Sequence, residues 1–157
     1  MKWLIPMLAC IPVTISAVNV DAGRLQGRPH IIDGDTVILQ GRKVRLAGVD
    51  APELDQSCNG WPAGEVARDY VVQLASSASM NCRPTGKHSY DRIVASCTVA
   101  GVDIALGLVS RGLAANASIY PPDYSAAEAG ARQRKLGIWK YGCRVPWLHR
   151  RRSGKQQ

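Results

Sequence analysis

The 157-residue sequence contains no phenylalanine and no Cys-X-X-Cys pair, and its three histidines, His30, His88 and His149, are far apart. These absences argue against a zinc cage, whose cysteine and histidine ligands usually come in closely spaced pairs. With 4 Trp and 5 Tyr but no Phe, the core must be packed mainly by aliphatic side chains. Acidic residues are also scarce, 12 against 20 Lys and Arg, so the formal net charge is +8. Such a basic chain suits a polyanionic partner: nucleic acid, an anionic envelope or an acidic glycan.

The first 22 residues are apolar but too short for a membrane span. Their apolar run, from Trp3 to Ala17, contains two prolines, follows Lys2 and precedes the small residue Ala22. This arrangement is typical of a secretory signal peptide. We therefore predict a signal peptide over 1–22, a single folded domain over 23–146 and a loose basic tail over 147–157. The protein is expected to be secreted or periplasmic, without stable membrane insertion; a lipoprotein signal ending at Cys10 is the alternative.

Four cysteines remain after residue 22, and an even number in an exported chain indicates disulfides, with three possible connectivities. Cys82 and Cys97 are nearly equidistant from the middle of a predicted loop, so they are expected to face each other across a hairpin and to form one disulfide. Cys58 and Cys143 are then paired only by elimination, and the partner of Cys58 stays open.

The periodicity of apolar residues predicts a mixed α+β fold. Asp33-Gly34 lies between two β-prone runs and indicates a hairpin within 28–40, and a third strand follows a turn at Gly41. Two more strands, 77–84 and 92–100, are expected on either side of a loop. Helical spacing covers three segments: 64–77, 102–114 with Asp103 as N-cap, and 124–139, where Ser125 and Glu128 form a capping-box pattern. Five short strands with about three α-helices favour an OB-fold barrel, whose open face often binds oligonucleotides.

Acidic and arginine side chains gather in one stretch, "VRLAGVDAPE" at 44–53. Asp50 ends a predicted strand, Glu53 follows it, and the first hairpin places Asp35 on the neighbouring strand. Carboxylates that converge at a strand end are hard-oxygen ligands, suited to Ca²⁺ or Mg²⁺. Arg45, together with Arg92 if the second hairpin packs alongside, would supply two planar cations that match phosphate oxygens.

The motifs "DGDT", "VRLAGVDAPE", "GEVAR", "YDR", "VSRGLA" and "AEAGARQRKLGIW" occur in the order and approximate spacing of the staphylococcal nuclease (thermonuclease) family. The chain resembles a secreted member of that family from about Leu25 to Trp139. The resemblance implies a Ca²⁺-dependent endonuclease, a monomer, that hydrolyses DNA and RNA and leaves 3′-phosphate ends. It also implies roles for individual residues: Asp35, Asp50 and the Ala51 carbonyl as calcium ligands, Glu53 as general base, Arg45 and Arg92 on the scissile phosphate, and Tyr90 and Tyr120 at the nucleotide.

Three positions, Ser89, Asp91 and Ser118, depart from the family pattern, and their effect on nucleotide affinity is left open. A binding module on the same fold, without catalysis, is the main alternative to an enzyme. A degenerate module is expected to lose its acids, because unpaired carboxylates repel phosphate, and the acids are present here. An envelope-binding protein would explain the charge but not this group of acids and arginines.

Overall fold

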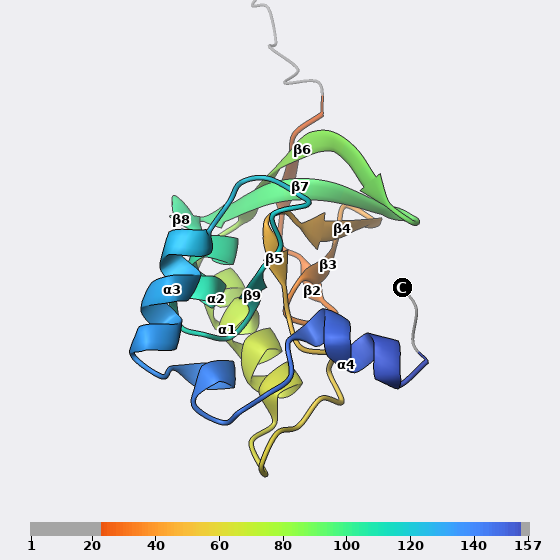
Figure 1. Ribbon diagram of the computed structural model, residues 1–157. Coiled ribbons are helices and arrows are strands. Elements are labelled where there is room, and N and C mark those ends of the chain that lie inside the picture. Colours follow the sequence, from red (N-terminus) through yellow and green to blue (C-terminus); the bar gives the residue numbers. More distant parts are fainter. Residues whose placement is uncertain (1–22, 155–157) are drawn as a thin grey trace, which may run out of the picture.

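A computed structural model describes residues 23–154, so the predicted signal peptide lies outside the described residues. This part of the chain has a mixed α+β fold (Figure 1). Its strands are β1 (Leu25–Gly27), β2 (His30–Ile31), β3 (Thr36–Leu39), β4 (Arg42–Leu46), β5 (Val49–Asp50), β6 (Met80–Ser89), β7 (Arg92–Val99), β8 (Val102–Asp103) and β9 (Ala115–Asn116). Its helices are α1 (Ala63–Ser77), α2 (Ile104–Ser110), α3 (Ser125–Gln133) and α4 (Pro146–Arg152), with a 3₁₀ turn, η1 (Gly137–Trp139).

The main sheet has the strand order β1-β6-β7-β4-β3-β2, with β8 attached to β7, and β5 pairs with β9 separately. The α+β class is confirmed, and the arrangement is consistent with an OB-like fold. Within residues 23–154, however, the end strands β1 and β2 pair only with β6 and β3, so the hydrogen-bonded path does not close into a barrel. The prediction of about three α-helices missed α4, at the end of the chain.

The hairpins follow the sequence signals closely. β2 and β3 are antiparallel around Asp33-Gly34, and β3 and β4 turn at Gln40 and Gly41, both with positive φ, as a type I′ turn requires. The loop predicted between 84 and 92 is wrong, because β6 continues to Ser89 and the turn shrinks to Tyr90-Asp91. Pro84 still pairs with Ala95, and a register shift follows between Pro84 and His88, so the strand continues past the proline.

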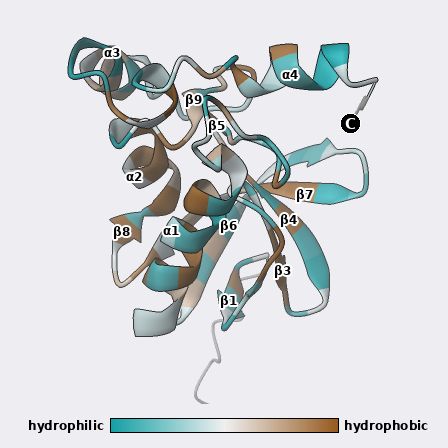
Figure 2. Ribbon diagram, turned by 90° about the horizontal axis from the view of Figure 1, so that it is seen from below, coloured by the Kyte–Doolittle hydropathy of each residue, from teal (hydrophilic) through white to brown (hydrophobic). Residues whose placement is uncertain are grey.

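The core lies between the sheet and the helices, and aliphatic side chains fill it as the composition predicts. Helix α2 is largely buried; it contacts both α1 and α3, and its ribbon is mostly hydrophobic (Figure 2). The largest fully buried side chains are Leu39, Leu46, Met80, Ile104, Leu108, Ile138, Val37, Val44, Val49, Val71, Val94 and Val99. Among residues 23–154, no helix is both long and apolar enough to cross a membrane.

Only one of the two predicted helix caps is confirmed. Asp103 accepts a hydrogen bond from the Leu106 amide at 3.1 Å and so begins α2. The capping box of α3 is wrong, since Glu128 accepts from the Asn116 amide at 3.2 Å instead of reaching back to the helix start. At the start of α3 the Asp123 carboxylate accepts a hydrogen bond from the Ser125 amide, at 3.1 Å. Glu128 therefore joins α3 to β9, a long-range use that local spacing does not reveal.

Both disulfides form. The predicted Cys82–Cys97 bond is confirmed, and the two residues face each other directly in the β6–β7 register. The pairing left by elimination, Cys58–Cys143, is also present, with a sequence separation of 85. It joins the segment before α1 to the segment that leads into α4.

We expect the double substitution of Cys82 and Cys97 by alanine to lower the free energy of unfolding by about 3 kcal/mol, because the bond closes a loop of this length in the unfolded chain. Urea unfolding of the parent and the variant measures the difference. An unchanged midpoint and slope would show that the bond contributes nothing.

Candidate active site

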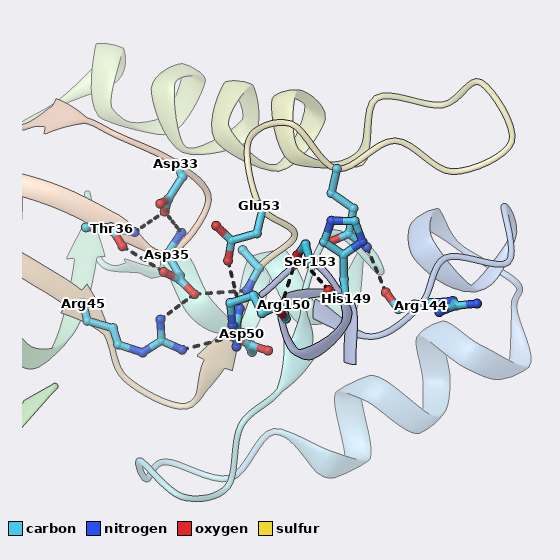
Figure 3. Close-up of polar contacts among 12 residues, drawn as sticks. Asp33, Asp35, Thr36, Arg45, Asp50, Glu53, Arg144, His149, Arg150 and Ser153 are labelled. Carbon is cyan, nitrogen blue, oxygen red and sulfur yellow. Dashed lines mark hydrogen bonds and ion pairs between the residues drawn. The ribbon is translucent and has the colours of Figure 1, made fainter. Parts of the chain in front are cut away.

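Two buried carboxylates converge where β3 begins and β5 ends. Asp35 precedes β3 and is 5% exposed, and Asp50 ends β5 and is 4% exposed. Arg45, on β4, lies between them: its Nη1 donates to Asp35 Oδ2 at 2.8 Å and its Nη2 to Asp50 Oδ1 at 3.2 Å (Figure 3). The structure therefore brings together the acids and the arginine that the sequence grouped.

The second predicted arginine joins the same cluster through a hydroxyl group. β4 and β7 pair in parallel, which carries Arg92, the first residue of β7, to this side of the sheet. Its Nη1 donates to Thr36 Oγ1 at 3.1 Å and its Nη2 to Ser89 Oγ at 3.2 Å. Thr36 Oγ1 in turn donates to Asp35 Oδ1 at 2.9 Å. Thr36 thus links Arg92 to Asp35, a role that the sequence did not assign.

Close backbone packing fixes the loop that carries Glu53. A side chain at Gly64 would collide with the Glu53 carbonyl, so glycine lets the start of α1 lie against this loop. The Gln56 amide donates to the Glu53 carbonyl at 2.8 Å, and the Gly64 amide donates to the Gln56 carbonyl at 3.1 Å. The buried Gln56 side chain also donates to the Arg144 carbonyl at 3.0 Å. The Glu53 loop, α1 and the approach to α4 are therefore held together.

The tail predicted over 147–157 is not loose over 147–152, and this corrects the prediction there, while 155–157 lie outside the described residues. Pro146–Arg152 form α4, which brings Arg150 into the cluster. Its Nη2 donates to Asp50 Oδ1 at 2.8 Å and its Nη1 to Glu53 Oε1 at 3.1 Å. In Figure 3 the guanidinium groups of Arg45 and Arg150 both turn toward Asp50. One guanidinium from α4 thus bridges two of the three acids expected at the catalytic centre, Asp50 and Glu53.

A pocket of about 440 Å³ opens beside these groups. Five predicted site residues line it: Arg45, Asp50, Tyr90, Arg92 and Tyr120. Its other lining residues are Ser89, Asn116, Ala117, Ser118, Ile119, Trp147 and Arg150. Three arginines and one aspartate thus face the pocket, which makes it suitable for an anion. Asp35, Ala51 and Glu53 do not line the pocket. Asp35 is hydrogen-bonded to Arg45, Ala51 to Asp35, and Glu53 to Arg150.

Burial raises the pKa values of two carboxyl groups in this cluster. Desolvation and the neighbouring Asp35 carboxylate raise the pKa of Asp33 to about 6, although Asp33 Oδ1 accepts hydrogen bonds from the Asp35 and Thr36 amides. Burial and Asp35 likewise raise the pKa of Asp50, against the opposing effect of Arg150 and Arg45. Crowded, partly compensated acids of this kind are typical of functional sites.

One of the expected cation ligands, Asp50, has a carboxylate oxygen that can bind a hard ion. Asp50 Oδ2 is buried and accepts no hydrogen bond from the described residues, so one carboxylate oxygen is available to a cation. Ala51 lies next to Asp35, since its amide donates to Asp35 Oδ2 at 3.2 Å. Among residues 23–154, no three histidine, cysteine or acidic side chains are arranged to hold a metal ion. Any ion would therefore rest on two carboxylates and backbone or solvent oxygens.

Sequence patterns did not predict four residues as part of the cluster or its pocket: Asp33, Thr36, Trp147 and Arg150. Asp33 and Thr36 belong to "DGDT", and that motif was a usable signal. Arg150 lies about a hundred residues from Asp50, and no local pattern connects the two. The basic stretch at the end of the chain pointed to it only as a cluster of charge.

Comparison with known proteins places the sequence in a family. Residues 43–141 match the family described as "Staphylococcal nuclease homologue". The chain is similar to the succinoglycan biosynthesis protein ExoI of Rhizobium meliloti (strain 1021), with 32% identity over 131 residues, 76% of this chain and 69% of the relative. It is 28% identical to the thermonuclease of Staphylococcus intermedius over 71% of this chain and 73% of that protein. It is 32% identical to the probable endonuclease lcl3 of Schizosaccharomyces japonicus over 65% of this chain, but it spans only 51% of that relative.

Proposed function

The chain belongs to the staphylococcal nuclease family, and from this premise we propose that it is an endonuclease that hydrolyses phosphodiester bonds of DNA and RNA and leaves 3′-phosphate ends. The observation that carries the proposal is the buried cluster in which Arg45 joins Asp35 and Asp50 beside a pocket lined by three arginines. We further propose that the enzyme acts as a secreted or periplasmic monomer. The two disulfides support this location, because such bonds persist in oxidising compartments.

The arginines are suited to the phosphate. Hydrolysis builds negative charge on the phosphoryl oxygens, and guanidinium groups held in fixed positions stabilise that charge without reorganising. Arg45 is fixed by Asp35, Asp50 and the Val49 carbonyl, and Arg92 by Thr36 and Ser89. Both side chains are over nine-tenths buried and still line the pocket. They would hold the scissile phosphate in one orientation.

Glu53 is proposed to accept the proton of the attacking water. The water oxygen bonds to phosphorus, the bond from phosphorus to the 5′-oxygen breaks, and the leaving oxygen gains a proton. Asp35, Asp50 and the Ala51 carbonyl would hold a divalent cation, Ca²⁺ in our proposal. When bound, that cation would add positive charge at the phosphoryl oxygens.

We expect cleavage to require a divalent cation, because the proposed ligands are all hard oxygens. The measurement is cleavage of plasmid and single-stranded DNA by the purified protein with Ca²⁺, and again with excess chelator. Restored activity on adding back Ca²⁺ is the control for irreversible loss. Undiminished cleavage in chelator would remove the cation assignment of Asp35 and Asp50.

The binding module remains the second candidate, and one contact favours it. Arg150 neutralises part of the charge on Asp50 and Glu53, which reduces the repulsion of phosphate by these acids. A protein that binds single-stranded DNA with and without Ca²⁺ but never cuts it would establish the module.

A further inference from the structure

Exposed apolar side chains gather at the proposed active-site pocket. Among residues 23–154, three of the eight large hydrophobic side chains that are exposed line this one pocket: Tyr90 at 74%, Ile119 at 72% and Trp147 at 48%. Single exposed apolar residues are ordinary, but several in one concave site mark a binding surface. Arg45, Arg92 and Arg150 line the same pocket.

The segment that carries Trp147 is held by contacts outside the indole ring, and the Arg151 guanidinium lies 5.9 Å from the centre of that ring. Cys143 is tied to Cys58 three residues before α4 begins, and Pro146 at the helix start is buried. Gln56 binds the Arg144 carbonyl, and Arg150 is paired with two carboxylates. The half-exposed indole is therefore presented to the pocket by an anchored segment. A ring on an anchored segment requires no ordering of the backbone when a ligand packs on it, which lowers the entropic cost of binding.

Aromatic rings beside arginines are the usual means by which proteins bind single-stranded nucleic acid, since the bases stack on the rings and the guanidinium groups hold the phosphates. We propose that Trp147 stacks on a nucleobase of the bound strand, so that α4 is part of the substrate-binding site. This inference rests on the proposed function in that it takes a nucleic acid as the substrate. Trp147 then contributes affinity for the base, whereas Arg45 and Arg92 contribute affinity for the phosphate.

The test compares a short oligothymidylate with an abasic strand that has the same number of phosphates. Binding is measured by fluorescence anisotropy in chelator, which blocks cation-dependent cleavage. Trp147→Ala should weaken binding of the oligothymidylate by about 5- to 150-fold, the range expected for loss of one base–aromatic stack. Its affinity for the abasic strand should stay at the parental value, because that strand has no base to stack.

Three further variants make the result specific. Trp147→Phe keeps an aromatic ring and should retain most of the affinity, and Trp147→Leu keeps apolar bulk without a ring and should not. Leu148→Ala is the matched control, since Leu148 is 41% exposed on the same helix and does not line the pocket. Circular dichroism and thermal unfolding check that each variant folds.

The inference is overturned if Trp147→Ala and Trp147→Leu bind oligothymidylate as the parent does, or lose affinity equally for both strands. It is independent of catalysis in this assay. If the parent never cuts but the Trp147 variants lose affinity only for the strand with bases, the proposed enzyme is contradicted and the stacking is supported. If the parent cuts but the Trp147 variants bind both strands as the parent does, the proposed enzyme is supported and the stacking is contradicted.

Discussion

Replacing Glu53 by glutamine is expected to lower kcat on single-stranded DNA by about 10²- to 10⁴-fold, the usual effect of losing a general base. The amide keeps the size of the side chain and an oxygen that accepts from Arg150, so the ion-pair geometry should be largely preserved. It cannot take a proton from water at neutral pH. Binding of an uncleavable oligonucleotide should change far less than kcat, because the carboxylate is proposed to act on the water.

The matched control for this substitution is Glu65→Gln, which removes an exposed acid from α1, a helix whose start packs on the Glu53 loop. It should leave kcat at the parental value. Circular dichroism establishes that both variants fold. A folded Glu53→Gln protein that cuts DNA at the parental rate would rule out Glu53 as the base.

Arg45→Lys is expected to be nearly as severe for a different reason. Arg45 donates through Nη1 to Asp35 and through Nη2 to both Asp50 and the Val49 carbonyl, and a single ammonium group cannot reproduce that fork. Loss of one preorganised donor to the transition state lowers kcat by about 10²- to 10³-fold. Leaving a buried acceptor without its partner should also reduce stability by about 1–3 kcal/mol.

Arg42→Lys, an exposed change on the same strand, is the control for Arg45→Lys and should alter neither quantity. Rates are compared at a temperature where both variants are folded, so that lost activity is not lost structure. If Arg45→Lys retained the parental kcat and the parental midpoint of unfolding, the guanidinium would have no special role.

The parts of the fold that local chemistry determines could be predicted from the sequence. The Asp33 side chain holds the first turn by accepting from the Asp35 and Thr36 amides, and Gln40 and Gly41 form the second with positive φ. Asp103 caps α2 by accepting from the Leu106 amide. The facing positions of Cys82 and Cys97 follow from counting residues along a hairpin. Asp35 directly precedes β3 and Arg45 lies on the adjacent β4, so the pattern of strands was enough to group them; Asp50 follows Arg45 closely in the chain, although it ends β5, which pairs with β9.

The remaining features depend on contacts between distant segments. Glu128 matches a capping box by spacing, yet its carboxylate binds the Asn116 amide, which only the folded chain brings close. The strand continues through Pro84, which still pairs with Ala95, and its register shifts only between Pro84 and His88, so its course depends on the partner strand. The position of α4 depends on a disulfide and on Gln56, neither of which marks the tail as part of the site.

The ion pairs of Arg150 give the proposed cation site a tethered counterion. Because Arg150 belongs to the chain, its effective concentration at the site depends on how α4 is attached. A divalent ion at Asp50 must share that carboxylate with the resident guanidinium. Arg150 holds Oδ1 and leaves Oδ2 to the ion, so part of the charge of the carboxylate is already neutralised when a divalent ion binds. Since the Cys58–Cys143 bond precedes the start of α4, we expect reduction of this one cysteine pair to alter the affinity of the proposed site for a divalent ion.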